Sequence, residues 1–254
     1  MPKKKNPSAF EKYAHEYDLV TNAAVREKNH ANEVKAMIDR FEPTRVLDAG
    51  CATGLTTRLF AQQGVETVGL DCQAPMIQVA SRHAAVRGLP VKFVKGYFES
   101  LPKNMTGQFD LIVCLANAIV GVETRSNLKR AYRNFYRVLK PGGWLVLQAL
   151  NYGVVNDGEL LPIKATENNG IIYERFRERT GRHFSVYVTR LDLNQTPPKL
   201  EVFRHDFDNF EPDYLVEAAN KVGFSPVKKY GNLLFTKRFS KKSNDLVLAA
   251  QRPR

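Results

Sequence analysis

The chain has 254 residues, of which 43% are hydrophobic and 25% charged, so it can bury the core of a globular protein of one large domain or one domain with an insertion. No apolar run reaches the roughly 18 residues of a membrane-spanning helix, and the basic start at residues 3–5 lacks the apolar stretch of a secretory signal. The net charge of +12 is spread over both 1–150 and 151–254, which leaves nucleic acid or an acidic molecule open as a partner.

The cysteines, like the lack of a secretory signal pattern, favour a cytoplasmic protein. The three cysteines form no Cys-x-x-Cys pair, which argues against a disulfide framework and against a cysteine-bound metal. We therefore expect a cytoplasmic protein with reduced thiols, without a metal site and without a membrane contact.

Strand and helix patterns alternate through residues 1–150. Apolar residues at helical spacing end at Phe41, and a short strand at 45–48, a glycine-punctuated turn at 49–54 and a helix up to Gly64 follow. The pattern continues with strands at 65–71, 91–94, 109–114 and 144–150, and with helices around 76–83 and 128–139, the second closed by a stop and a tight turn at 140–143. Strands that alternate with helices pair in parallel, so this part predicts a doubly wound α/β sheet.

The last strands of that sheet come late in the chain. A helix at 215–222 precedes strands at 225–230 and 245–250, which complete a mostly parallel seven-stranded sheet. Between them, 171–179 and 183–191 alternate around a turn at 180–182, and a third strand follows at 199–205. We expect a core of 1–150 and 206–254, with residues 1–42 as an N-terminal helical cap, and an inserted antiparallel β meander at 151–205.

The glycine turn and the acids around it indicate a ligand site. In a doubly wound sheet, ligands bind at the carboxyl ends of the strands, beside the first strand-to-helix turn. Here that turn opens with Asp48 and contains Gly50 and Gly54, and Asp71 ends the second strand, where a carboxylate can accept ribose hydroxyls. Asp48 would repel a pyrophosphate, so a cationic ligand is favoured. Taken singly, a plain tight turn and a helix cap at Asp71 explain these residues equally well.

Taken together, these segments resemble the class I S-adenosylmethionine-dependent methyltransferases. The resemblance is carried by 46–54, 68–71, Met76, 98–102, 109–114 and 139–143. It implies S-adenosylmethionine as the cofactor and S-adenosylhomocysteine as the product. It also implies a cofactor site in which Asp48 and Gly50 hold the methionine part, Gly54 closes the turn and Asp71 holds the ribose. Cys72, Met76, Phe98 and Leu115 would surround the adenine and line the site.

Two positions depart from the family pattern. Ala52 stands where many members have glycine, and we expect a negative φ there, which any residue adopts. Tyr97 stands where many have an aspartate that accepts from the adenine amino group, so Phe98 and Glu99 are the local substitutes.

Within the family, the chain is similar to the glycine and glycine/sarcosine N-methyltransferases and related small-molecule enzymes. That similarity implies cofactor contacts for Tyr13 and Arg26, although Arg26 also fits an ordinary surface arginine. It implies substrate contacts for the residues Tyr17, Asn117, Asn151 and Tyr152. Tyr13 and Tyr17, four residues apart, equally predict one aromatic face of a packed helix. Leu150 replaces an arginine that binds the substrate carboxylate in glycine methyltransferases, which disfavours glycine itself.

We predict methyl transfer to a small-molecule acceptor, with an amine nitrogen favoured because a neutral amine needs no strong base. No catalytic residue is assigned, since the five histidines are scattered. The alternatives are O-methylation of a small metabolite, methylation of RNA or transfer RNA, and cofactor binding without turnover. RNA is the less favoured partner, because the segment after 109–114 lacks the motif of base-amine methyltransferases and no recognition module is present.

Overall fold

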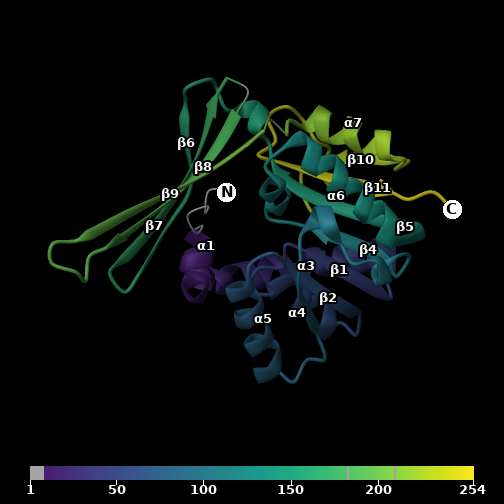
Figure 1. Ribbon diagram of the computed structural model, residues 1–254, viewed down its shortest axis with the longest axis horizontal. Helices are drawn as coiled ribbons and strands as arrows, with labels where there is room; N and C mark the ends of the chain where they lie inside the picture. Colours follow the sequence, from purple (N-terminus) through teal and green to yellow (C-terminus); the bar gives the residue numbers. More distant parts are fainter. Residues whose placement is uncertain (1–8, 182, 209) are drawn as a thin grey trace, which may run out of the picture.

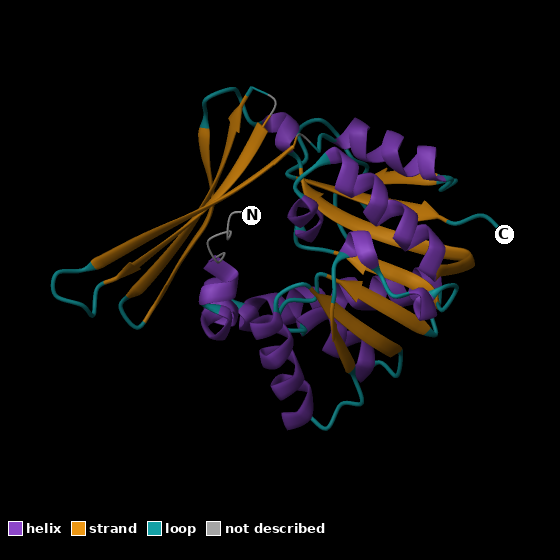
Figure 2. Cartoon of the chain, in the orientation of Figure 1, coloured by secondary structure: helices purple, strands orange, loops and turns teal. Residues whose placement is uncertain are grey.

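Two sheets organise the computed structural model, which describes residues 9–181, 183–208 and 210–254 (Figure 1). A seven-stranded sheet with helices on both faces forms the core, and a strongly twisted four-stranded sheet stands beside it (Figure 2). The basic run at residues 3–5 and Arg182 of the predicted hairpin turn lie outside the described residues.

The core sheet has the strand order β10-β11-β5-β4-β1-β2-β3. Its strands are β1 (Arg45–Ala49), β2 (Glu66–Asp71), β3 (Lys92–Lys95), β4 (Phe109–Cys114), β5 (Leu139–Leu150), β10 (Val227–Tyr230) and β11 (Asp245–Gln251). The strands from β3 to β5 are parallel, whereas β11 runs antiparallel to both β5 and β10. This arrangement confirms the predicted doubly wound, mostly parallel seven-stranded sheet.

Helices cover the two faces because the central strands are apolar on both. Along β4, Leu111 and Val113 join the cluster under α3 and α4, while Ile112 joins the cluster under α6 and α7 on the opposite face. The helices are α1 (Ala9–Lys12), α2 (Tyr17–Val20), α3 (Ala23–Phe41), α4 (Leu55–Gln62), α5 (Ala74–Val86), α6 (Arg125–Val138) and α7 (Pro212–Val222). Short 3₁₀ turns are η1 (Ala14–Glu16), η2 (Phe98–Ser100), η3 (Lys103–Met105), η4 (Ala118–Val122) and η5 (Tyr152–Val154).

The second sheet is the predicted antiparallel meander with one strand more. Its order is β6-β7-β8-β9, with strands β6 (Leu160–Asn168), β7 (Ile171–Thr180), β8 (His183–Asp192) and β9 (Lys199–Asp208). The sequence pattern does not predict β6, because Pro162 interrupts it. An edge strand tolerates a proline, and the pairing with β7 shifts register between Pro162 and Lys164.

Aromatic side chains join the second sheet to the core. The ring of Tyr152, which follows β5, lies 4.7 Å from the ring of Phe184 and 5.3 Å from that of Phe207. Phe210, which precedes α7, continues the stack on Phe207 at 6.0 Å. The N-terminal helices α1 and α2 fill the space between the second sheet and the core (Figure 1).

Three local expectations need correction. The predicted turn at 140–143 lies within β5, which starts directly after α6 and whose pairing with β4 shifts register between Phe109 and Leu111. Tyr13 and Tyr17 do not share a helix face, because Tyr13 lies between α1 and η1 and Tyr17 begins α2. Ala52 has a φ of +47°, not the negative value expected.

Within the described ranges, we find no helix that is both long and apolar enough to span a membrane.

Candidate functional site

The turn between β1 and α4 lies at the carboxyl ends of β1 and β2. The backbone N–H groups of Gly50 and Cys51 donate to the carbonyl of Leu70 in β2, at 2.7 and 3.0 Å. Gly50 has a φ of +86°, and a Cβ there would lie 2.5 Å from the Cβ of Ala118. Only glycine fits at that point, because Ala118 and Phe98 occupy the space that a Cβ would take.

Asp48 is buried at the start of this turn. Its Oδ2 accepts a hydrogen bond of 2.6 Å from the hydroxyl of Thr57 in α4. Burial raises the pKa of Asp48 to about 6, the Thr57 hydrogen bond opposes this, and the nearby charge of Asp71 adds to it. A cation placed beside Asp48 would relieve the cost of its buried charge.

Asp71 holds the turn from the neighbouring strand. Its carboxylate accepts from the backbone N–H of Ala52 at 3.0 Å and from that of Gln73 at 2.9 Å. Burial raises the pKa of Asp71, while these backbone donors lower it. The Ala52 contact also accounts for the positive φ of that alanine, since the bond holds its backbone in the strained region.

These features fit S-adenosylmethionine. The cofactor carries an ammonium and a sulfonium, which suit the buried carboxyl of Asp48, and ribose hydroxyls, which suit a carboxylate at the end of β2. Gly50 lines the cleft together with Asp48.

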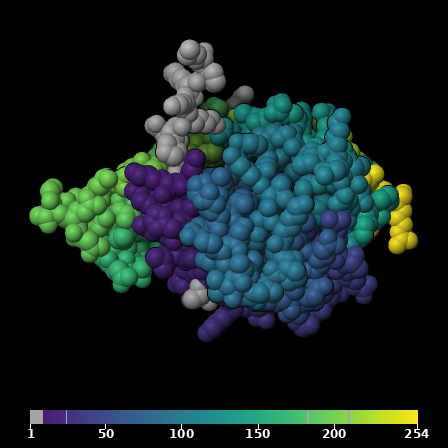
Figure 3. Space-filling view, turned by 60° about the horizontal axis from the view of Figure 1, so that its bottom comes forward, coloured from purple at the N-terminus to yellow at the C-terminus, as the bar shows by residue number. Residues whose placement is uncertain are grey.

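Three parts of the chain contribute residues to the cleft above the turn. Its lining consists of Tyr17, Arg26 and His30 from α2 and α3, residues Asp48, Gly50, Cys51, Ala52, Thr53, Leu55 and Thr56 from β1 to α4, and Leu115 and Ala116 after β4. In Figure 3 the N-terminal segment lies between the second sheet and the core. The structure therefore brings five of the predicted residues together: Tyr17, Arg26, Asp48, Gly50 and Leu115.

Besides Asp71, four predicted cofactor residues lie around the turn without lining the cleft. Gly54 is the N-cap residue of α4, and a Cβ there would meet the ring of Phe93 at 2.8 Å. Met76 is buried in α5 beside Ala14, and Cys72 is exposed. The ring of Phe98 lies 3.3 Å from where a Cβ of Gly50 would stand, which puts that side chain at the edge of the turn.

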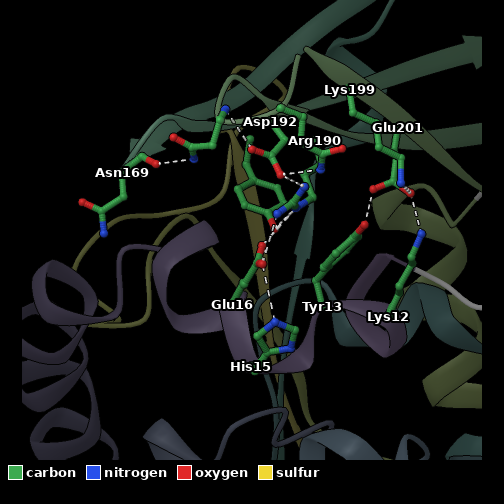
Figure 4. Close-up of polar contacts among 12 residues, drawn as sticks. Lys12, Tyr13, His15, Glu16, Asn169, Arg190, Asp192, Lys199 and Glu201 are labelled. Atoms are coloured by element: carbon green, nitrogen blue, oxygen red, sulfur yellow. Dashed lines mark hydrogen bonds and ion pairs between the residues drawn. The ribbon is translucent and has the colours of Figure 1, made fainter. Parts of the chain in front are cut away.

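Tyr13 lies on the second sheet, away from the turn. Its hydroxyl donates to Glu201 of β9, and its ring makes edge contacts with Tyr173 and Phe203. Glu16 and Arg190 add a second link, in which two guanidinium nitrogens donate to the carboxylate at 3.1 and 3.2 Å (Figure 4). These contacts hold the N-terminal segment against the second sheet.

Three of the four predicted substrate residues, Asn117, Asn151 and Tyr152, lie at the base of the second sheet, and each makes hydrogen bonds there. Asn117 donates to the hydroxyl of Tyr152 at 2.8 Å and accepts from the backbone of Leu150. The side chain of Asn151 donates to the carbonyls of Lys241 and Ser243. Asn151 and Tyr152 are both buried, and Asn151 ties the end of β5 to the loop before β11. The substrate contacts of these residues stay a prediction.

A His–Glu pair on α3 was not among the predicted site residues. The Nδ1 atom of His30 lies 3.4 Å from Oε2 of Glu33, and His30 lines the cleft one turn after Arg26. Burial, helped by the charge of Arg26, lowers the pKa of His30 to about 4, while burial raises the pKa of Glu33 to about 7. The spacing of Arg26, His30 and Glu33 on one helix face was the available signal.

Known proteins share both the sequence and the architecture. A family model described as a methyltransferase domain matches residues 46–143. The glycine/sarcosine N-methyltransferase of Halorhodospira halochloris is 25% identical over 206 residues, which cover 77% of this chain and 70% of that protein. The ubiquinone biosynthesis O-methyltransferase of Bordetella avium is 27% identical over 118 residues, 46% of this chain and 47% of that protein.

A solved structure agrees with the fold. The S-adenosylmethionine-bound amino pentose methyltransferase CalS10 of Micromonospora echinaspora superposes with a TM-score of 0.70 at 23% identity, covering 91% of this chain and 96% of that one. The sheet order, the methyltransferase domain matched over residues 46–143 and the acidic glycine turn together support a class I S-adenosylmethionine-dependent methyltransferase, with S-adenosylmethionine as its cofactor.

Proposed function

We propose that this methyltransferase transfers a methyl group to an amine nitrogen of a small molecule. The observation that carries the proposal is the cleft at the carboxyl ends of β1 and β4, which Tyr17, Arg26 and His30 narrow from the side of the second sheet. The glycine/sarcosine relative supports a nitrogen acceptor, since it matches most of this chain, whereas the O-methyltransferase relative matches less than half.

Each cofactor residue has a role that its position supports. When the cofactor is bound, Asp48 would hold its ammonium group, Arg26 its carboxylate and Asp71 its ribose hydroxyls. Gly50 and Gly54 keep the turn open, and the adenine side is formed by Cys72, Met76, Phe98 and Leu115. Tyr13 is left out of this set because its hydroxyl is committed to Glu201.

The protein's share of the chemistry is mainly geometric. When bound, S-adenosylmethionine supplies a methyl group that is already activated by its sulfonium. The residues of the cleft have to align the acceptor's lone pair with that methyl group and exclude water. The second sheet, within residues 151–205, and the N-terminal segment serve as the cover of the acceptor, with Tyr17 and Asn117 nearest to it.

A methyl-transfer screen with labelled cofactor tests the proposal. The panel contains amines, amino acids, amino sugars, phenols and total RNA, and mass spectrometry locates the added methyl group. We expect labelled products among the nitrogen acceptors and none with an Asp48→Ala variant. Transfer to phenols alone would establish the oxygen-acceptor alternative, and transfer to RNA alone would overturn the small-molecule proposal.

A further inference from the structure

Three basic side chains share one face of the second sheet. Lys164 of β6 lies directly opposite Arg175 of β7 in the register, and Arg177 follows two residues later on the same face. Tyr173 belongs to this face too, and it contacts Tyr13 of the N-terminal segment. The face therefore looks toward the N-terminal helices and the core.

This basic face adjoins the cleft. Lys164 Nζ donates to the carbonyl of Thr21, just before α3, at 3.4 Å. The charge of Arg26, which lines the cleft, contributes to a lowered pKa at both Lys164 and Arg175, after the larger effect of burial. At the other end, Arg177 donates to the carbonyl of Asn151 at 3.5 Å. The three cations thus extend from the cleft-lining helix to the end of β5.

None of the three is in an ion pair with any residue that the structure describes. Arg177 is only 9% exposed, and its Nε has no hydrogen-bond partner among the described residues. Other arginines of the same sheet are paired: Arg190 binds Glu16 and Asp192, and Arg204 binds Asp206. The charge of Arg177 also acts on Asp245, but the two side chains form no ion pair. A buried guanidinium without an ion pair is costly, so a site that keeps one favours an anionic ligand.

We propose that Lys164, Arg175 and Arg177 bind an anionic group of the methyl acceptor, either a carboxylate or a phosphate. The guanidinium groups offer paired donors that match both anions, and Lys164 adds a point charge. The inference rests on the proposed function, because it places the acceptor between this face and the cofactor turn. It narrows the substrate class from amines in general to amines that carry a negative charge.

Matched acceptor pairs test the proposal by activity. The pairs are sarcosine with sarcosinamide, and glucosamine 6-phosphate with glucosamine, so that the charged group changes while the amine stays. We expect the wild-type enzyme to favour the charged member of at least one pair, which identifies the anion as carboxylate or phosphate. Arg175→Gln should lower kcat/KM for that member at least tenfold and leave its neutral partner within about twofold. Arg204→Gln, on the opposite face of the sheet, is the matched control and should change neither.

If neither member of any acceptor pair is methylated, a binding measurement tests the anion site directly. Inorganic pyrophosphate and succinate are titrated into the S-adenosylhomocysteine complex by calorimetry. We expect one of them to bind the wild type and the Arg204→Gln variant, and to bind Arg175→Gln at least tenfold more weakly, with Arg175→Lys in between. Arg177→Gln is included only where its thermal midpoint matches the wild type.

The outcomes separate the two proposals. Equal turnover of charged and neutral amines, unaffected by Arg175→Gln, overturns the anion site and leaves the amine methyltransferase standing. Binding of neither probe, together with no preference for charged acceptors, also overturns the anion site. Anion binding that requires Arg175, with no amine methylated, supports the site and overturns the proposed function.

Discussion

Asp48 carries an electrostatic cost that the cofactor removes. Its pKa is raised to about 6 by burial, so the folded, cofactor-free protein holds a proton there more tightly than the unfolded chain does. The stability of the free protein should fall as the pH rises from about 4 through 6, and above that range the penalty is complete at about 3 kcal/mol.

We expect Asp48→Asn to stabilise the cofactor-free protein at pH 7 by up to about 3 kcal/mol, because the amide keeps the Thr57 hydrogen bond without a charge. Thermal unfolding of both proteins at pH 4.5 and pH 7 checks this, and their difference should shrink at the lower pH. Calorimetry should show S-adenosylmethionine bound more than tenfold more weakly by the variant. A variant that is less stable than the wild type at pH 7 would contradict the assigned cost.

The same ionisation governs cofactor affinity. The cationic cofactor favours the charged carboxyl, so the affinity should increase as the pH rises through about 6 and level off above it. Calorimetric titrations between pH 5 and pH 8 measure the profile. The Asp48→Asn variant should give a flatter curve, and an equally steep one would assign the titration to another group.

Replacing Gly50 by alanine has two costs, the strain of a positive φ and a steric clash of the new Cβ. Comparison with Gly64 separates them. Gly50 and Gly64 both have a positive φ, but a Cβ at Gly64 would have nothing within 4 Å, whereas one at Gly50 would meet Ala118. Gly64→Ala should therefore cost about 1 kcal/mol, the conformational penalty alone, and Gly50→Ala should cost clearly more. Urea unfolding of both variants measures the difference in stability. Equal losses of stability would mean that Ala118 and the rest of η4 move away from the new Cβ without cost.

For single residues, the sequence predicts which side chains belong to the site better than it predicts their backbone conformations. Asp48, Gly50 and Arg26 were placed in one site, and they do line one cleft. The left-handed conformation of Ala52 could not be read from the sequence, because a contact from Asp71, nineteen positions away, imposes it. The His30–Glu33 pair escaped notice for a similar reason, since only the folded packing buries it.

Among the elements, the N-terminal segment depends most on tertiary contacts. The α1 and α2 helices have four residues each, too few to be stable alone. The segment is held by Glu16 and Arg190, whose buried guanidinium lies over the rings of Tyr13 in the segment and Tyr173 in β7.

We expect Arg190→Gln to release the segment. Backbone amides between residues 9 and 20 should exchange with deuterium at least tenfold faster, while the core strands keep their protection. Hydrogen exchange read by mass spectrometry resolves the two regions. Arg204→Gln removes an exposed ion pair of the same sheet and should leave the segment protected. Unchanged exchange in Arg190→Gln would show that aromatic packing alone holds the segment.

Elements with their own local pattern were predictable, and those shaped by neighbours were not. The strands β1, β2 and β4 are continuous apolar runs, and each was found within a residue or so of its observed bounds. The β6 strand was missed because Pro162 breaks its pattern, and it is stabilised by pairing with β7. The spacing of Tyr13 and Tyr17 suggested one helix, but contacts with Glu201 and Arg190 break the segment into short turns.

For the whole molecule, cofactor binding should be visible as added stability. A ligand that binds only the folded state adds about 2.7 kcal/mol at a hundred times its Kd. For a chain of this length the thermal midpoint should rise by about 5 to 10 °C with S-adenosylhomocysteine. Differential scanning calorimetry measures the rise, and Asp71→Ala should abolish most of it. An equal rise in that variant would remove Asp71 from the proposed site.

The net charge of +12 was the least informative whole-molecule feature at the start. In the structure, part of it is concentrated on one face of the second sheet, where Lys164, Arg175 and Arg177 stand without a carboxylate partner among the described residues. Sequence alone could not separate these cations from solvated ones, because their placement depends on the pairing of β6 with β7. The cytoplasmic location stays a prediction.

The chain passes from the core to the second sheet once and returns once, and hydrogen bonds hold it at both points. Asn151 bonds to the loop before β11 through its backbone and side chain, and Asp208 bonds to the turn before α6. Every residue proposed for the adenosine and methionine ends of the cofactor lies outside the segment between them. The proposed anion site for the acceptor therefore lies within one continuous stretch of the chain, whereas Tyr17 and Asn117, the other proposed acceptor contacts, lie outside it. Replacing that stretch together with these two residues would change the acceptor and leave the cofactor site intact.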